Sequence, residues 1–296
     1  MPETSPPALD PRLTPARRDL AAKHLAGKVD ATRFVEGRSY EVGEAQAPVR
    51  RAPSPEAPLD TEALLGECLI VYDLDEEGWA WGQLEQDGYV GFLPASALRL
   101  PGPPVTHKVS ALRTLVFPGP SLKLPPIQYL PLGARLAVAR MEQAFAITFS
   151  GGYAPARHLA VLNTTEPDFV AVAERFLGAP YLWGGKTNLG VDCSGLVQVA
   201  LAACGIPCPR DSDMQEKSLG EPIASSCSMF NRLQRGDLLF WEGHVAIVRD
   251  ETTLIHANAY HMAVAIEPIR EAITRTRAAG NEITSVRRLS PRSGPA

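Results

Sequence analysis

The chain passes from a glycine-rich loop into an apolar segment within one stretch, Tyr181-Leu182-Trp183-Gly184-Gly185-Lys186-Thr187-Asn188-Leu189-Gly190-Val191-Asp192-Cys193-Ser194-Gly195-Leu196. The apolar residues from Cys193 to Ala203 predict a buried helix, and Asp192 is a favourable N-cap residue. Cys193 would lie in the first turn, where unpaired backbone N–H groups and the helix dipole favour a thiolate. The same N–H groups would stabilise an oxyanion beside the sulfur. A lone cysteine here is also often an inert buried residue, so its interpretation depends on partners elsewhere.

Two histidines downstream offer those partners. His244 opens a short apolar strand pattern just after Gly243, and His256 lies in the next strand pattern, from Leu254 to Ala257. In an antiparallel hairpin the two histidines would be neighbours. His244 would then accept the proton of the Cys193 thiol, and His256 would hold the ring of His244.

The segments around these residues predict an α+β domain. Pro167 to Leu177 has the apolar spacing of a helix, with proline near its first turn. Strand patterns follow at residues 237–241, 244–248, 253–257, 264–266 and 285–289. Helices first and antiparallel strands afterwards are typical of α+β folds.

The first half of the chain has a different character. Of the 27 prolines, 19 fall within residues 1–160 and eight within 161–296. Proline removes a backbone donor, so long helices are not expected there. Strand patterns at 68–73, 79–84 and 89–93, joined by tight turns, predict a small β-barrel. Weaker strand patterns between 104 and 163 predict a second barrel.

These patterns divide the chain of 296 residues into four parts. Residues 1–60 are expected to form an extension and linker, with part of the extension left open as belonging to the first barrel. The first barrel is placed at 61–102, the second at 103–163, and the α+β domain at 164–296.

Composition excludes several classes of partner. The net charge is −4 and no basic stripe occurs, which argues against nucleic acid. No apolar run is long enough for a membrane span, and the first residues lack the pattern of a secretory signal. We therefore expect a cytoplasmic monomer. A disulfide framework is not expected from five dispersed cysteines, Cys68, Cys193, Cys204, Cys208 and Cys227.

Neither a metal nor a cofactor is predicted. Cys204 and Cys208 have metal-like spacing, but no second ligand pair follows at zinc-finger distance. Gly185-Lys186-Thr187 matches the end of a phosphate-binding loop, yet Pro180 stands where the opening glycine belongs.

The motifs DCSGLV, GDLLFW, GHVAIV and LIHA resemble the NlpC-type cysteine peptidases, a papain-like α+β superfamily that cleaves bacterial cell-wall peptides. The resemblance covers roughly residues 165–290. It implies that Cys193 is the nucleophile, His244 the base and His256 the orienting residue. The stretch EEGWAWGQLEQDGYVGFLPASAL, residues 76–98, resembles a bacterial SH3-like domain.

The combination of two SH3-like modules with such a domain resembles the γ-D-glutamyl-L-diamino acid endopeptidases of murein recycling. That resemblance implies a substrate with a free N-terminal L-Ala, cleaved after γ-D-glutamate. It also implies that an acid of the first barrel and an Asp-Ser pair hold the substrate amine. The best matches are Glu67 for the acid, and Asp211 with Ser212 for the pair. Two carboxylates suit an ammonium group, whose burial is costly unless it is paired.

The same resemblance implies roles for the remaining site residues. Tyr89 would form an aromatic wall, Trp183 and Ser194 would line the site, and Tyr181 would assist near the oxyanion, with Asp192 in support. Simpler roles remain open: Asp211 as a helix cap, Glu67 as an exposed acid and Tyr89 as barrel core. An amidase or acyltransferase of the same superfold, or a non-catalytic protein that binds wall peptides, are the alternative functions.

Overall fold

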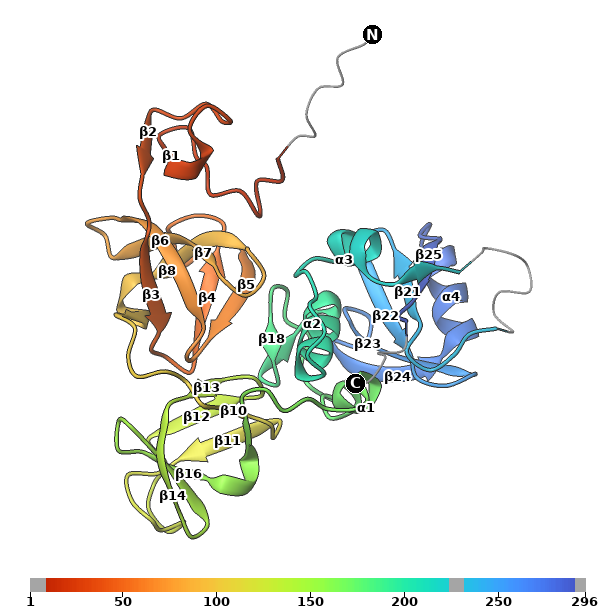
Figure 1. Ribbon diagram of the computed structural model, residues 1–296. Coiled ribbons are helices and arrows are strands. Elements are labelled where there is room, and N and C mark those ends of the chain that lie inside the picture. The colour runs from red at the N-terminus through yellow and green to blue at the C-terminus, as the bar shows by residue number, and fades with distance from the viewer. Residues whose placement is uncertain (1–8, 224–231, 291–296) are drawn as a thin grey trace.

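The computed structural model describes residues 9–223 and 232–290, so Cys227 lies outside the described part. Figure 1 shows two β-rich modules beside a mixed α/β domain. Within the described ranges, no helix has both the length and the apolar character needed to cross a membrane.

The first β module is built around one antiparallel sheet of seven strands. Alternate residues point inward and form a core that includes Val42, Val49, Leu69 and Leu93. The strand order is β5-β4-β8-β7-β6-β3-β9. The bounds are β3 Arg38–Val42, β4 Gln46–Arg50, β5 Leu59–Leu64, β6 Cys68–Leu74, β7 Trp79–Leu84, β8 Val90–Pro94, a 3-10 turn η2 Ala95–Ala97 and β9 Leu98–Arg99.

This sheet takes in residues 38–64, which the sequence patterns assigned mainly to an extension and linker. The prolines of the tract 47–58 hid an alternation in which Ala47 and Val49 face the core. Pro48 lies opposite Glu62 of β5, whereas on its other edge β4 pairs with β8 only at Arg50–Phe92. Proline has no N–H to give to a ladder, and a sparsely paired edge of this kind tolerates it.

The residues before Arg38 pack on this module. A short parallel pair joins β1 Leu20–Ala22 to β2 Arg33–Val35, with a 3-10 turn η1 Lys23–Leu25 between them. Further upstream, the backbone N–H of Val90 donates to the carbonyl oxygen of Arg12 at 2.8 Å. The Arg17 guanidinium lies over the ring of Trp81, 4.5 Å from its centroid. These contacts bring the first described residues alongside β8.

The second β module consists of three small sheets with strand orders β13-β10-β17, β11-β12 and β14-β15-β16. Its core contains Val109, Val116, Leu130 and Leu136, and Leu65 from the first module packs into it. The bounds are β10 His107–Val109, β11 Arg113–Val116, β12 Gln128–Pro131, β13 Arg135–Leu136, β14 Val138–Glu142, β15 Phe145–Thr148, β16 Tyr153–Pro155, a 3-10 turn η3 Ala156–His158 and β17 Leu159–Val161.

The α/β domain contains a six-stranded antiparallel sheet of order β20-β25-β21-β22-β23-β24. Its bounds are α1 Phe169–Glu174, β18 Lys186–Thr187, β19 Gly190–Val191, α2 Cys193–Ala203, α3 Ser212–Ser218, β20 Glu221–Pro222, β21 Leu238–Trp241, β22 His244–Val248, β23 Thr253–Asn258, β24 Ala263–Pro268, α4 Ile269–Ala278 and β25 Ile283–Arg288.

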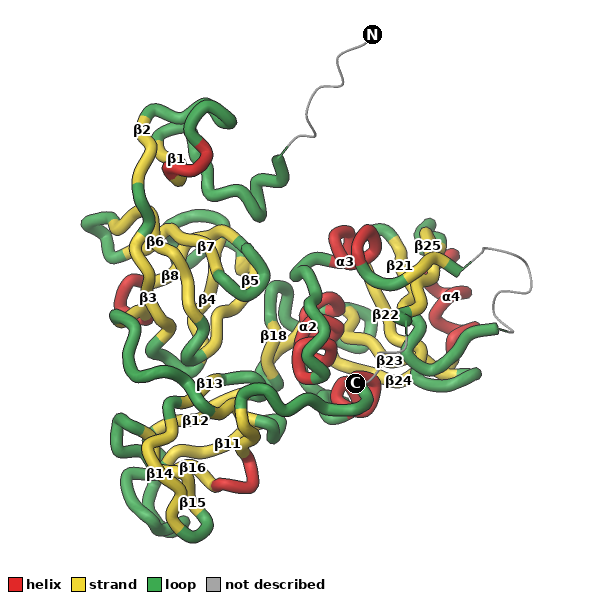
Figure 2. The backbone as a smooth tube through the Cα atoms, viewed as in Figure 1, coloured by secondary structure: helices red, strands yellow, loops and turns green. Residues whose placement is uncertain are grey.

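Helices cover both faces of this sheet. One core packs α1 and α2 against Phe240, Val245 and Ile255, and the other packs α4 against Leu239 and Ala246. Side chains alternate along each strand, so successive residues serve opposite cores. Figure 2 shows the short strand β18, with loops next to it, where the first β module approaches α2.

Candidate active site

Cys193 is the first residue of α2 and lines a cavity of about 240 Å³. The preceding residue, Asp192, is the N-cap and accepts a hydrogen bond from the N–H of Gly195 at 2.7 Å. Asp192 also accepts one from the N–H of Gly184 at 2.8 Å. The same carboxylate therefore begins the helix and holds the glycine-rich loop that leads to the thiol.

A buried arginine neutralises this carboxylate. Arg210 is 1% exposed and donates to both oxygens of Asp192, at 2.9 and 2.7 Å. It also donates to Oγ of Ser194 at 2.9 Å. Two-point pairing of this kind offsets the cost of burying both charges. Sequence reasoning missed Arg210, whose only local signal was its position directly before Asp211.

The first β module is fixed to the nucleophile loop by polar contacts. Nε of Arg210 donates to Oγ1 of Thr61 in β5 at 2.9 Å, and the N–H of Lys186 donates to Glu62 at 2.8 Å. Gly184 has a φ of +79°, and a Cβ on it would lie 2.5 Å from the carbonyl oxygen of Leu59. In Figure 1 the β18 hairpin accordingly stands between β5 and α2.

The two histidines lie on neighbouring strands. His244 begins β22 and His256 lies within β23. Their rings are joined by a hydrogen bond of 2.8 Å between Nε2 of His244 and Nδ1 of His256. The backbone N–H of Val245 donates to the sulfur of Cys193, which brings the start of β22 to the thiol.

Burial decides the protonation of the resting thiol and imidazole. It raises the pKa of Cys193 to about 12, reinforced by Asp192 and opposed by the N–H groups of Val245 and Ser194. Burial, aided by the charges of His256 and Arg275, lowers the pKa of His244 to about 3. Both groups are therefore neutral near pH 7. The N–H groups at the helix terminus do favour the thiolate, as the sequence predicts, but desolvation outweighs them.

Two aromatic residues of the loop also line the cavity. Trp183 is 63% exposed and forms part of the rim. Burial, followed by the charges of Cys193 and Asp192, raises the pKa of Tyr181 to about 12. The Tyr181 hydroxyl therefore stays protonated and can donate to an oxyanion.

Asp211 brings a carboxylate to the same cavity. It precedes α3 at the N-cap position, but its side chain makes no capping hydrogen bond. Its Oδ2 accepts from the hydroxyl of Tyr89 at 3.2 Å and from Arg12 at 2.8 Å. Burial raises the pKa of Asp211, while Arg210 and Arg12 oppose that shift. Ser194 and Ser212 complete this side of the lining, and Tyr89 also packs in the core of the first module.

The placement of Glu67 in the cavity is wrong. Glu67 is buried, accepts from the N–H of Leu64 at 3.0 Å and pairs with Nζ of Lys186 at 3.3 Å. It follows the left-handed turn residue Gly66, whose φ is +77°, and lines a separate cavity between the modules. The acid of the first module that lines the Cys193 cavity is Asp60, paired with Arg51 at 2.6 Å.

Arg12 is a further residue that sequence reasoning missed. Its guanidinium donates to Asp10, Asp211 and Asp213. No local pattern signals this contact, because Arg12 and Asp211 are 199 positions apart. The segment treated as an extension therefore contributes to the wall of the cavity.

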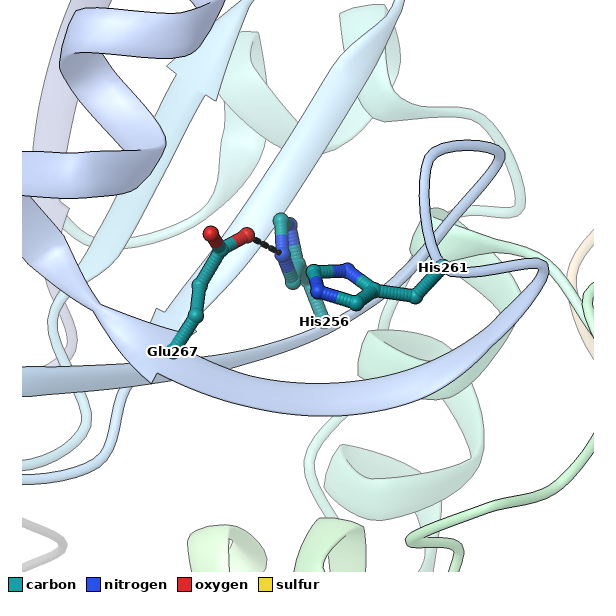
Figure 3. Close-up of side chains that lie close together, drawn as sticks. All are labelled: His256, His261 and Glu267. Carbon is teal, nitrogen blue, oxygen red and sulfur yellow. Dashed lines mark hydrogen bonds and ion pairs between the residues drawn. The ribbon is translucent and has the colours of Figure 1, made fainter.

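Three side chains near the histidine pair could also be considered as metal ligands. One ligand atom of each of His256, His261 and Glu267 lies within 4.8 Å of the others. Figure 3 shows the three side chains lying close together. Both ring nitrogens of His256 are already engaged, Nδ1 by His244 and Nε2 by Glu267. Nδ1 of His261 contacts Oδ1 of Asn258 at 3.0 Å. Hydrogen bonds thus engage both ring nitrogens of His256, both oxygens of Glu267 and Nδ1 of His261.

Comparison with known families places two domains on the chain. The model described as the NlpC/P60 family matches residues 178–282, and the model described as the bacterial dipeptidyl-peptidase SH3 domain matches residues 49–98. The first match contains Cys193, His244 and His256. The second contains strands β5 to β8 of the first module in full, together with the last two residues of β4.

Individual relatives agree with these matches. Dipeptidyl-peptidase 6 of Lysinibacillus sphaericus is 38% identical over 103 residues, which are 35% of this chain and only 36% of that protein. Gamma-D-glutamyl-L-lysine dipeptidyl-peptidase of Bacillus cereus is 26% identical over 243 residues, covering 71% of each chain.

A solved structure shares the fold. The crystal structure of an NlpC/P60 family protein from Bacillus cereus superposes with a TM-score of 0.70 at 21% identity, covering 85% of this chain and 99% of that one. The comparisons thus match a bacterial SH3 domain to residues 49–98 and an NlpC/P60 domain to residues 178–282, and the solved structure shares the fold.

Proposed function

We propose that this protein is a cysteine endopeptidase that cleaves the γ-D-glutamyl–diamino acid bond of cell-wall peptides bearing a free N-terminal L-Ala. The observation that carries the proposal is that the Cys193 thiol and the Asp211 carboxylate line the same small cavity. Only one oxygen of that carboxylate accepts hydrogen bonds from described residues. The name of the Bacillus cereus relative supports the same bond.

The chemistry follows from the neutral thiol and imidazole. When substrate binds, the S–H proton moves to His244 and the sulfur attacks the γ-carbonyl carbon of D-glutamate. The N–H groups at the start of α2 and the hydroxyl of Tyr181 would stabilise the oxyanion. The imidazolium of His244 then protonates the leaving amine. Water, activated by the same imidazole, hydrolyses the thioester and releases L-Ala-D-Glu.

Asp211 is the centre of the proposed amine site. Arg12 and Tyr89 both donate to its Oδ2, whereas Oδ1 accepts no hydrogen bond from any described residue. An ammonium group has three donors and no acceptor. Oδ1 of Asp211 would take one of them, and Asp60 would provide the second negative charge in place of Glu67.

The volume of the cavity supports recognition of the substrate at its N-terminal end. A volume of about 240 Å³ is below the roughly 300–1,000 Å³ of sites for drug-sized ligands, so only a short segment fits beside the thiol. A blocked amine would lose its pairing with Asp211 and meet the wall formed by the first module. Peptides still attached to the wall have blocked amines. We therefore include murein recycling, in the cytoplasm and by a monomer, in the proposal.

The test uses L-Ala-γ-D-Glu-meso-diaminopimelate and its N-acetylated form. We expect the wild type to release L-Ala-D-Glu from the free peptide and to cleave the acetylated peptide far more slowly, and we expect Cys193→Ala to be inactive. Failure of the wild type to cleave, or full activity of Cys193→Ala, would sink the proposal. Transfer of the acyl group to an added amine, in place of hydrolysis, would identify an acyltransferase instead.

A further inference from the structure

The histidine pair is connected to a buried carboxylate that the proposed mechanism does not use. Glu267 lies on β24 and is 7% exposed. One of its oxygens, Oε1, lies 2.7 Å from Nε2 of His256, the contact drawn in Figure 3. In the β23–β24 register His256 is opposite Ala265, so Glu267 is its diagonal neighbour on the same face.

An arginine from α4 keeps this carboxylate ionised and in place. Arg275 donates to both oxygens of Glu267. Burial acts to raise the pKa of Glu267, but the hydrogen bonds from Arg275 and His256 outweigh it and bring the pKa to about 2. Glu267 is thus a carboxylate throughout the neutral range, fixed by two-point pairing.

The charge of Glu267 fixes which nitrogen of His256 carries a proton. An ionised carboxylate can only accept hydrogen bonds, so Nε2 of His256 must be the donor. Burial lowers the pKa of His256, although Glu267 opposes the shift, and the ring is therefore neutral near pH 7. A neutral imidazole has one N–H. Nδ1 of His256 must consequently be an acceptor.

The tautomer of His256 in turn determines that of His244. Because Nδ1 of His256 is an acceptor, the 2.8 Å contact requires Nε2 of His244 to be the donor. His244 is also neutral near pH 7, so its Nδ1 carries a lone pair and no proton. That nitrogen is the one left to take the proton from Cys193.

We propose that Glu267 is a positioning residue that sets the tautomers of both histidines, so that the unprotonated Nδ1 of His244 is available to the Cys193 thiol. The proposal rests on the proposed cysteine-peptidase chemistry. When the S–H proton moves to Nδ1 of His244, both nitrogens of that ring carry protons and the ring is positive. The hydrogen-bond chain through His256 then ends on a negative charge, which stabilises the imidazolium.

The wild-type protein gives the first test. Nitrogen-15 NMR of a sample labelled at histidine distinguishes protonated from unprotonated ring nitrogens. We expect a protonated Nε2 and an unprotonated Nδ1 in both His244 and His256 at pH 7. A protonated Nδ1 on neutral His244 would overturn the proposal, and this measurement needs no variant and no substrate.

The second test compares Glu267→Gln with Glu271→Gln, an exposed change on the helix that carries Arg275. An amide can donate as well as accept, so Glu267→Gln no longer imposes one tautomer and loses the negative charge. We expect mixed tautomers, a fall in kcat of at least about 100-fold and little change in KM, as when a group orienting a catalytic histidine is altered. Glu271→Gln should match the wild type in all three.

Two further measurements separate this role from simple support of the fold. Glu267→Asp keeps an acceptor-only carboxylate and should retain the wild-type tautomers, with kcat above that of Glu267→Gln. The rate at which iodoacetamide modifies Cys193 at pH 7 should fall in Glu267→Gln and not in Glu271→Gln. Wild-type tautomers together with a wild-type alkylation rate in Glu267→Gln would contradict the proposal.

These measurements also test the role of Glu267 separately from the proposed peptide substrate. Tautomers and alkylation do not depend on any peptide. If the wild type shows the expected tautomers but cleaves no γ-D-glutamyl peptide, the substrate proposal fails and the role of Glu267 stands. If the peptide is cleaved but His244 has the opposite tautomer, the reverse holds.

Discussion

The reactivity of Cys193 depends on two opposing local effects. Its position at the start of α2 presents N–H groups to the sulfur, but burial and the adjacent Asp192 disfavour the thiolate. His244 is kept neutral by its own burial. The thiol and the imidazole are therefore both neutral before attack, and His244 takes the proton only as the sulfur attacks the substrate.

The rate of alkylation should therefore rise with pH. The raised pKa of Cys193 means that the thiolate fraction grows about tenfold per pH unit through the neutral and mildly alkaline range. We expect iodoacetamide modification of the peptide that contains Cys193, followed by mass spectrometry, to accelerate steadily from pH 6 to pH 10. A rate that is already constant at pH 6 would show a resting thiolate–imidazolium pair and contradict this account.

Asp211→Asn should damage binding of the free amine more than the chemical step. Loss of a charged hydrogen bond costs about 1.5–3 kcal/mol, so we expect KM for the free peptide to rise about 10- to 100-fold with kcat little changed. The N-acetylated peptide has no ammonium to lose, and its kcat/KM should change much less. Equal losses for both peptides would assign Asp211 a role other than amine recognition.

At the scale of elements, short apolar strands were easy to predict and polar helices were not. The patterns at residues 237–248 and 253–257 correspond to β21, β22 and β23. The helix α4 was missed, although Ile269, Ala272 and Ile273 have helical spacing and face the second core. Its surrounding arginines and threonines obscured that stripe. Missing this helix also meant missing a residue near the site, because α4 carries Arg275.

The junction between β5 and the glycine-rich loop depends on Gly184. A side chain here would adopt a positive φ and also meet the carbonyl oxygen of Leu59. Gly178 is the matched control, since its φ is +82° but no atom lies within 4 Å of a built Cβ. We expect Gly178→Ala to cost about 1–2 kcal/mol of unfolding free energy, from the left-handed backbone alone.

Gly184→Ala should cost more than that and should also lower kcat, because the loop that holds Asp192 must shift. Denaturant unfolding and peptide cleavage of the two variants provide the comparison. Equal stability and equal activity of Gly184→Ala and Gly178→Ala would show that the close approach to β5 does not position the site.

At the scale of the whole molecule, buried polar pairs join the modules. Glu67 of the first module pairs with Lys186 of the α/β domain, and both side chains are 5% exposed. Arg210 links Thr61 to the N-cap of α2. A buried pair of charges contributes little net stability over apolar packing, but breaking one leaves an uncompensated charge. These contacts therefore fix the wall of the cavity relative to the nucleophile.

Glu67→Ala tests whether this residue acts in the fold or in substrate binding. Leaving Lys186 buried and unpaired should lower the free energy of unfolding by about 3–5 kcal/mol. KM measured well below the unfolding transition should stay close to that of the wild type. The exposed change Glu85→Ala serves as the control for stability. A large rise in KM without loss of stability would instead support the substrate-binding role expected from the sequence.

The local chemistry of this protein could be predicted from its amino-acid sequence alone. The run from Asp192 into an apolar helix, and the histidines that open or occupy short strands, are patterns of neighbouring residues, and neighbouring residues decide caps and strand faces. The α+β order and the small β module followed from periodicity and turn residues in the same way.

The distant residues that complete the site depend on how the chain packs. Asp60, and not Glu67, lines the cavity, and Arg12 from the start of the described chain contacts Asp211. Glu267, paired with Arg275, contacts His256 at the end of the hydrogen-bond chain from His244. No short-range pattern encodes these contacts, because the chain separations are long and each depends on how β5, β24 and α4 pack. Burial also reversed the expected charge state of Cys193, since desolvation is a property of the packed molecule and not of the helix that begins at that residue.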